Sequence, residues 1–127
     1  MDKALYVGIG GLVGSVLRYW VGSLVQQTAN NPSFPLGTLA VNLTGCLVIG
    51  FLSQLADARN IFTPEARLFV FTGILGGFTT FSTFGNETMD LLRSGQILPA
   101  LLNTTLHIFA GLSAVWLGRS LAWWIWR

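Results

Sequence analysis

Four long apolar runs constrain this chain more than any other feature of its sequence. They cover about residues 4–25, 36–56, 65–89 and 96–118, and short polar segments separate them. A helix that crosses a bilayer needs about 20 apolar residues, so each run is long enough to span a membrane. Only 9% of the residues are charged, against about 25% in a typical soluble domain. The sequence therefore predicts an all-α membrane protein, with a single domain of four transmembrane helices over residues 1–127.

The third run contains an interruption. The stretch Gly73–Asn86 holds adjacent glycines, four hydroxyl residues and phenylalanines at positions 78, 81 and 84. Glycine and β-branched threonine both weaken a helix. Backbone groups released at membrane depth must be buried in protein or line a cavity. The sequence thus predicts a third helix that is broken at mid-membrane, either for packing or at a binding site.

The residues of this break fit two kinds of ion site. An aromatic ring has a positive edge, and ring edges in a narrow path contact an anion weakly enough for it to leave again. A core or lipid-facing aromatic stripe is the plainer interpretation, although the intervening hydroxyls disfavour lipid contact. Alternatively, carbonyl oxygens released by the break can coordinate a hard cation such as sodium. Carbonyls from two subunits around an axis would complete such a site.

Arg18 is a basic residue within the first run. It lies on one stripe with Gly10, Gly14 and Gly22 at four-residue spacing. Glycines at this spacing favour close packing between membrane helices. Arg18 either extends toward the membrane surface or donates hydrogen bonds to backbone carbonyls or to an anion vestibule.

Polar residues also share one face of the second run, where Thr38, Asn42 and Cys46 are four residues apart. Asn42 either joins two helices by a hydrogen bond or donates to something that passes through. The fourth run has a similar face with Asn103, His107 and Gly111. His107 is either a hydrogen-bonded packing group or a ligand or proton carrier.

Flanking cations predict the orientation in the membrane. Arg93 and, at most, Arg18 belong to one side. The side of the N-terminus collects Lys3, Arg59, Arg67, Arg119 and Arg127. By the positive-inside rule, that side is cytoplasmic. Trp116–Arg127 holds four of the five tryptophans, which is typical of an interfacial anchor.

Other functional classes find little support. Cys46 is the single cysteine, which excludes an internal disulfide and a multi-cysteine metal site. We find no nucleotide-binding loop and no Ser-His-Asp set, so we expect neither an enzyme nor a nucleic-acid partner. Four short helices do not easily enclose a polar path, and the glycine faces favour helix partners. We therefore expect an oligomer.

Three motifs resemble one family. The segment Gly76-Gly-Phe-Thr-Thr-Phe-Ser-Thr-Phe84 closely resembles the signature of the CrcB/Fluc fluoride channels. The first and second runs are also similar to that family in Gly10-Gly11-x-x-Gly14-x-x-x-Arg18 and Gly37-Thr38-Leu39-x-x-Asn42-x-x-Gly45. The resemblance covers the first three spans closely and the whole chain in length and layout.

The resemblance implies a multi-pass protein of the bacterial plasma (inner) membrane that exports toxic fluoride passively and excludes chloride. Two copies would form an antiparallel dual-topology dimer with two pores. Phe81 and Phe84 would line the pore, with Asn42 as a nearby donor and with Thr38, Ser82 and Thr83 along a polar track. The carbonyls of Gly76 and Thr79 from both subunits would hold a structural sodium ion, and Arg18 matches the family's first-span arginine.

Two features depart from that pattern. Asn103, His107 and Gly111 stand where the family often carries hydroxyl residues. The cation bias exceeds what dual topology leads us to expect, so the partner is either a second copy, which we favour, or a separate inverted chain. Two alternative functions are a structural or assembly subunit of a membrane complex and a small multidrug exporter. The exporter class needs a carboxylate in its first span, where this chain has Arg18.

Overall fold

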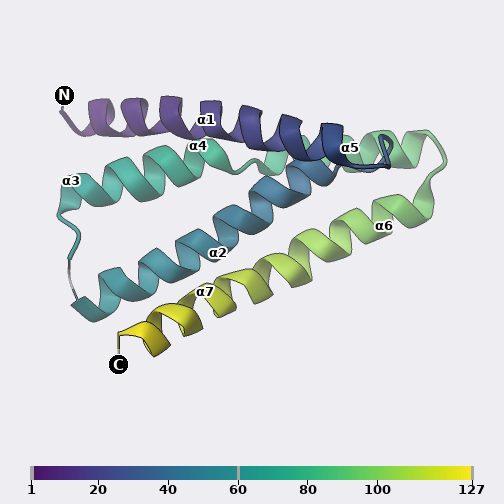
Figure 1. The fold of residues 1–127 in the computed structure, drawn as a ribbon. Helices are drawn as coiled ribbons and strands as arrows, with labels where there is room; N and C mark the ends of the chain where they lie inside the picture. Colours follow the sequence, from purple (N-terminus) through teal and green to yellow (C-terminus); the bar gives the residue numbers. More distant parts are fainter. Residues whose placement is uncertain (1, 60, 127) are drawn as a thin grey trace.

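The computed structural model describes residues 2–59 and 61–126, and every regular element in this part of the chain is a helix. The helices join into four rods (Figure 1). The rods comprise α1 (Asp2–Thr28); α2 (Leu36–Arg59); α3 (Pro64–Arg67), η1 (Leu68–Leu75), α4 (Gly76–Phe78) and α5 (Phe81–Arg93); and α6 (Ile97–Thr105), η2 (Leu106–Ala110) and α7 (Gly111–Ile125). Each rod is long and apolar enough to cross a membrane. The predicted fold class, all-α with four membrane-length helices, is confirmed.

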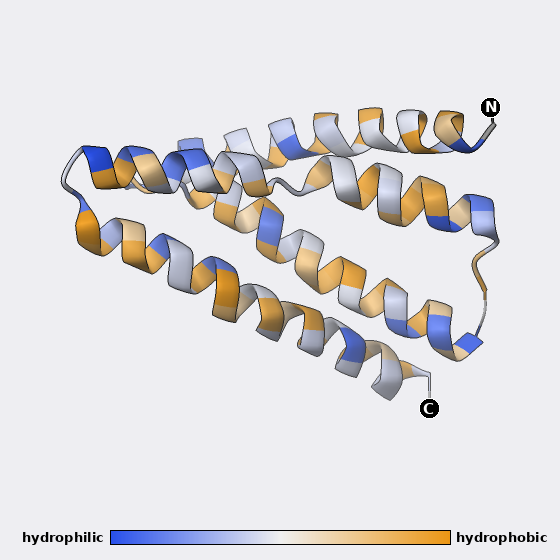
Figure 2. Cartoon of the chain, turned by 180° about the vertical axis from the view of Figure 1, so that it is seen from behind, coloured by the Kyte–Doolittle hydropathy of each residue, from blue (hydrophilic) through white to orange (hydrophobic). Residues whose placement is uncertain are grey.

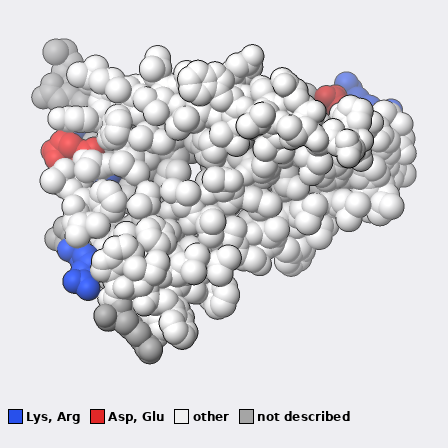
Figure 3. Space-filling view, in the orientation of Figure 1, with Lys and Arg blue, Asp and Glu red and all other residues white. Residues whose placement is uncertain are grey.

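Each rod packs against particular neighbours. α1 lies along η1 and α4, α2 packs against α7, and α5 packs against α6 (Figure 1). Both termini lie at one end of the bundle and the turn between α5 and α6 lies at the other. Gly95 makes that turn with a φ of 75°, which favours glycine. Apolar residues follow most of each rod (Figure 2), and charged side chains gather toward the two ends (Figure 3).

Cations tie the helix ends together near the termini. Arg119 pairs with Asp57 at 2.9 Å and joins α7 to α2. Arg59 donates to the carbonyl oxygen of Trp126 at 3.3 Å, and Arg67 donates to a backbone carbonyl at the end of α2. These three arginines belong to the set that we assigned to one side of the membrane. Arg127, another member of that set, lies outside the described residues.

Glycines allow the helices to touch along their backbones. A Cβ atom built on Gly14 would overlap the carbonyl oxygen of Ile74 in η1, and one on Gly10 would also overlap η1 backbone. The predicted close-packing face of the first span is therefore confirmed. α2 and α7 approach in the same way, because Cβ atoms on Gly50 or Gly118 would overlap carbonyl oxygens of the facing helix.

The third rod begins and breaks for identifiable reasons. Thr63 caps α3 by accepting a hydrogen bond from the Ala66 N–H at 3.2 Å, and Pro64 follows at the first helical position. The rod breaks at Thr79 and Thr80, whose φ and ψ are −89° and 157°, and −151° and 111°. The predicted interruption is confirmed. We expected both glycine and threonine to weaken this helix. The break falls at the threonines, whereas the adjacent glycines 76 and 77 stay helical in α4.

Candidate functional site

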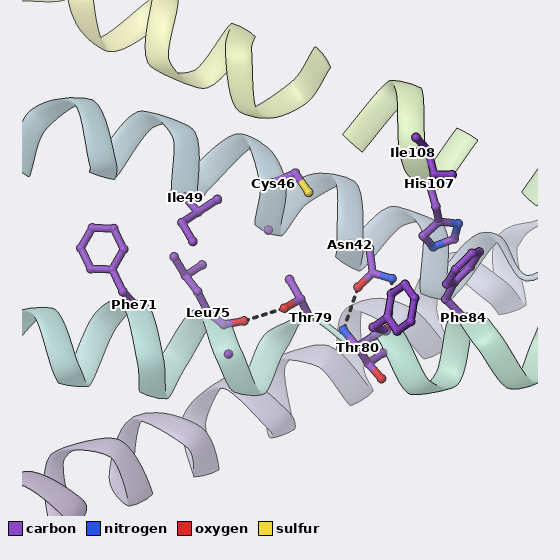
Figure 4. Close-up of a pocket in the computed structure, with 13 residues that line it drawn as sticks. Asn42, Cys46, Ile49, Phe71, Leu75, Thr79, Thr80, Phe84, His107 and Ile108 are labelled. Atoms are coloured by element: carbon purple, nitrogen blue, oxygen red, sulfur yellow. Dashed lines mark hydrogen bonds between the residues drawn. The ribbon is translucent and has the colours of Figure 1, made fainter. Parts of the chain in front are cut away.

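Asn42 holds the break in the third rod open. Its Oδ1 accepts a hydrogen bond from the Thr80 N–H at 2.8 Å (Figure 4). Its Nδ2 donates to the Thr80 carbonyl oxygen at 3.1 Å. The Thr80 hydroxyl in turn caps α5 by accepting from the Thr83 N–H at 3.3 Å. Asn42 thus links α2 to the third rod. An amide nitrogen carries two N–H groups, so one donor remains for a further partner.

Arg18 lies on the other side of the break. Its Nη1 donates to the Thr79 carbonyl oxygen at 3.3 Å, and the side chain is half-buried. Of the two roles that we considered for Arg18, donation to a backbone carbonyl is the one that this contact supports. The Thr79 hydroxyl donates to the Leu75 carbonyl oxygen at 3.0 Å, so this side chain extends the helical hydrogen bonding of α4.

The break releases carbonyl oxygens. In an unbroken helix the Gly76 carbonyl would accept from the Thr80 N–H, four residues later. That N–H donates to Asn42 instead. The Thr79 carbonyl oxygen receives the Arg18 guanidinium and, because a carbonyl oxygen has two lone pairs, can take a second partner. Main-chain carbonyls freed from helical hydrogen bonding can coordinate hard cations such as sodium in broken membrane helices, so these oxygens fit the predicted ion.

A cavity of about 390 Å³ lies beside the break, between α2, η1, α5 and η2. The residues that matter most among its lining are Asn42, Cys46, Thr79, Phe81, Phe84 and His107. Phe84 is only 9% exposed and its ring stacks on that of His107, with centroids 4.2 Å apart and planes tilted by 34° (Figure 4). Phe81 is 82% exposed, and its ring centroid lies 5.4 Å from that of Phe84. The cavity therefore has one aromatic wall that is buried and another that faces outward from the chain.

The remaining residues of the predicted polar track, Thr38, Ser82 and Thr83, do not line this cavity. Thr38 lies on α2 one turn before Asn42, and its hydroxyl donates to Glu87 Oε1 at 2.7 Å. A second cavity of about 530 Å³ opens there, and Glu87 and Asp90 line it. Ser82 and Thr83 are exposed on α5, where Thr83 accepts a hydrogen bond from the Thr80 hydroxyl at 2.9 Å. Asn42 and both phenylalanines come together at one cavity, whereas Ser82 and Thr83 lie outside its lining.

From the sequence we missed Glu87, and we named Asn103 without identifying its partner. Glu87 was not among the candidate site residues, yet it accepts the Thr38 hydrogen bond. Its position three residues after Phe84 places both on one helix face, and that spacing was the available signal. Asn103 is fully buried, and its Nδ2 donates to the Thr88 hydroxyl at 2.9 Å, which joins α6 to α5. Its partner was not visible from the spacing of the fourth span.

These features define a class: a four-span membrane protein whose broken third helix borders a cavity with aromatic and amide walls. The model of the family described as "CrcB-like protein, Camphor Resistance (CrcB)" matches residues 5–119. The chain belongs to this family, and it is a multi-pass bacterial membrane protein. Three relatives are each named "Fluoride-specific ion channel FluC". That from Elusimicrobium minutum is 48% identical over 93% of this chain and 91% of its own length. Those from Methylobacillus flagellatus and Flavobacterium psychrophilum are 43% and 42% identical, over 95% and 96% of this chain and 94% and 98% of their own lengths.

Proposed function

We propose that this chain is a fluoride-selective channel that lets fluoride leave the cell passively. The observation that carries the proposal is the convergence of Asn42, Phe81 and Phe84 on one cavity beside the break. The names of the related proteins support the same ion. A small multidrug exporter and an assembly subunit are set aside, because those relatives are named ion channels over nearly their whole length.

The residues of the cavity suggest how fluoride would pass. Fluoride is a small and strong hydrogen-bond acceptor, and it needs donors to replace water. Asn42 has an N–H group left after its bond to Thr80, and the edges of Phe81 and Phe84 carry partial positive charge. Such contacts are weak enough for the ion to leave. A larger halide gains less from a narrow path lined by few donors, so the same walls favour fluoride.

A second copy in inverted orientation would complete the path. Phe81 is 82% exposed in the single chain, although it is a large apolar ring that borders the cavity. A partner that covered Phe81 would turn the open side of the cavity into a wall. Two inverted copies would make two equivalent paths in an antiparallel dimer.

Lys3 is the single lysine, so labelling with an impermeant amine reagent tests this arrangement. Dual topology predicts labelling from both sides of the membrane, and a fixed orientation predicts labelling from one side.

A sodium ion would sit where the two copies meet. The Gly76 and Thr79 carbonyl oxygens would hold it, and each copy would contribute both. The ion would supply a fixed positive charge that joins the two broken helices. Arg18 would keep its bond to the Thr79 carbonyl and fix the direction of that oxygen.

Fluoride efflux from liposomes tests the function directly. We expect rapid efflux with the wild-type protein, with chloride retained, and at least about tenfold slower efflux in Phe81→Ala and Phe84→Ala, roughly the effect of losing 1.4 kcal/mol of favourable interaction. Phe109→Ala is the matched control, because Phe109 is 67% exposed on η2 and does not line the cavity. Fast fluoride flux retained in both cavity variants would remove the role assigned to these rings.

Exchange of the cation tests the sodium site separately. With sodium replaced by N-methylglucamine, which is too large for a site of main-chain oxygens, we expect the dimer to dissociate more readily and the flux to fall. Size-exclusion chromatography and efflux would be measured on the same preparation. A dimer with the same stability and flux in both cations would refute the site and leave the fluoride proposal standing.

A further inference from the structure

The fourth rod places an imidazole against the buried wall of the cavity. His107 lies on η2, and its ring stacks on Phe84 with centroids 4.2 Å apart. Its Nδ1 lies 2.9 Å from the carbonyl oxygen of Asn103 on the same rod. Because a carbonyl oxygen only accepts, Nδ1 must carry the proton in this contact. The neutral ring therefore has a bare lone pair at Nε2.

That lone pair has no partner to occupy it. Nε2 is shielded from water and has no hydrogen-bond partner among the described residues. Nδ1 is turned back to the backbone of its own rod, and the His107 side chain lines the cavity beside Phe84. A lone pair at that place repels an anion, whereas a proton there would make the ring a cationic donor.

The surroundings offer no protein carboxylate to balance such a charge within the cavity. Among the described residues that line it, Cys46 on α2 is the only other titratable side chain. On α5, Glu87 lies one turn beyond Phe84 and accepts the Thr38 hydrogen bond. On the first rod, Arg18 donates to the Thr79 carbonyl and adds positive charge near the break. An anion that enters the cavity beside Phe84 would therefore balance the positive charge of a protonated His107.

We infer that His107 makes fluoride occupancy of this cavity proton-linked: proton uptake at Nε2 and anion binding beside Phe84 strengthen each other. The inference rests on the proposed function. The imidazole stacks on one face of Phe84, and a ring edge, which carries partial positive charge, is the part that an anion would contact. The His107 and Phe84 rings are close enough for a charge on His107 to act on an anion at the edge of Phe84 without direct contact. Linkage is reciprocal, so fluoride must raise the proton affinity of His107 by the factor by which the proton raises fluoride affinity.

Single-channel current in planar bilayers tests the linkage, because neutral hydrogen fluoride carries no current. We expect the fluoride concentration for half-maximal current to fall at least about threefold between about pH 8 and about pH 5.5, which brackets the ordinary titration of histidine. His107→Gln should conduct with a half-maximal concentration independent of pH. Cys46→Ala, which removes the other titratable group of the cavity, should keep the wild-type pH dependence. An identical pH response in wild type and His107→Gln would overturn the inference, whereas the absence of any fluoride current would overturn the proposed function instead.

Nitrogen NMR gives a second measurement that does not depend on conduction. His107 is the only histidine in the chain, so ¹⁵N-histidine labelling with a histidine-free tag reports this ring alone. At high pH we expect Nδ1 protonated and Nε2 bare, and we expect fluoride, but not chloride, to shift the titration of the ring to higher pH. A ring with its proton on Nε2 at high pH, or a titration that fluoride leaves in place, would refute the linkage.

Discussion

Replacement of Asn42 by leucine tests whether this amide holds the break in the third rod. Leucine has nearly the same size but can neither donate nor accept, so both hydrogen bonds to Thr80, at 2.8 and 3.1 Å, are lost. The N–H and carbonyl groups of Thr80 would then lack their partner in a half-buried, mostly apolar setting.

The expected cost follows from these two bonds. A net hydrogen bond contributes about 1 kcal/mol in a folded protein, and side-chain bonds between membrane helices average about 0.6 kcal/mol. A buried group left unpaired adds about 1–3 kcal/mol. We therefore expect the free energy of unfolding to fall by about 2–4 kcal/mol, below the sum of these terms because part of the released backbone can rearrange or reach water.

Unfolding in mixed micelles, followed by the fluorescence of the five tryptophans, measures this change. Thr44→Val is the control, because Thr44 lies exposed on the same helix and valine matches its shape. We expect the control to stay within about 0.5 kcal/mol of wild type. Hydrogen exchange gives the local reading, since the Thr80 amide should lose protection in Asn42→Leu. A stability within about 0.5 kcal/mol of wild type with that amide still protected would refute the assignment of the break to Asn42.

Two further changes test the packing of the bundle. Gly14→Val should destabilise the fold by about 1–3 kcal/mol or more, because its Cβ would overlap the Ile74 carbonyl oxygen. Gly8→Val, on the open face of α1, should cost nothing, because valine has a higher helix propensity than glycine. Equal effects of the two variants on unfolding would show that α1 does not pack on η1 through Gly14. Arg119→Gln should change the free energy of unfolding by only about 0–1 kcal/mol, since Arg119 and Asp57 are 44% and 58% exposed. A loss above about 2 kcal/mol in the same unfolding assay would mean that this ion pair is far less solvated than its exposure indicates.

The overall fold could be predicted because its signals are local or periodic. Apolar runs set the four rods. Thr63 and Pro64 are residue types typical of a helix start, and Gly95 is typical of the turn that follows the third rod. The residue at which the third run breaks was harder to predict from the sequence. We attributed the break to the adjacent glycines together with β-branched threonine, and the intrinsic cost of glycine in a helix is about 1 kcal/mol per residue. At Gly77 the absence of a side chain serves a different purpose, because a Cβ there would come within 2.6 Å of the Gly11 carbonyl oxygen in α1.

The break depends instead on a competition between two acceptors for one donor. The Thr80 N–H can pair with the Gly76 carbonyl and continue the helix, or with Asn42, which is 38 residues away in the chain. Only the packing of α2 beside the third rod brings the second acceptor within reach, so no local pattern in residues 73–86 decides the outcome.

A similar limit applies to the two phenylalanines of the cavity. Phe81 and Phe84 are equivalent in spacing and chemistry, yet one is 82% exposed and the other 9%. Three residues along a helix differ by about 60° in direction, since each residue turns it by about 100°. That difference matters because His107 on η2 covers the Phe84 ring and leaves the Phe81 ring open. The sequence identified the residues that meet at the cavity, but the burial of each ring depends on its neighbour in another rod.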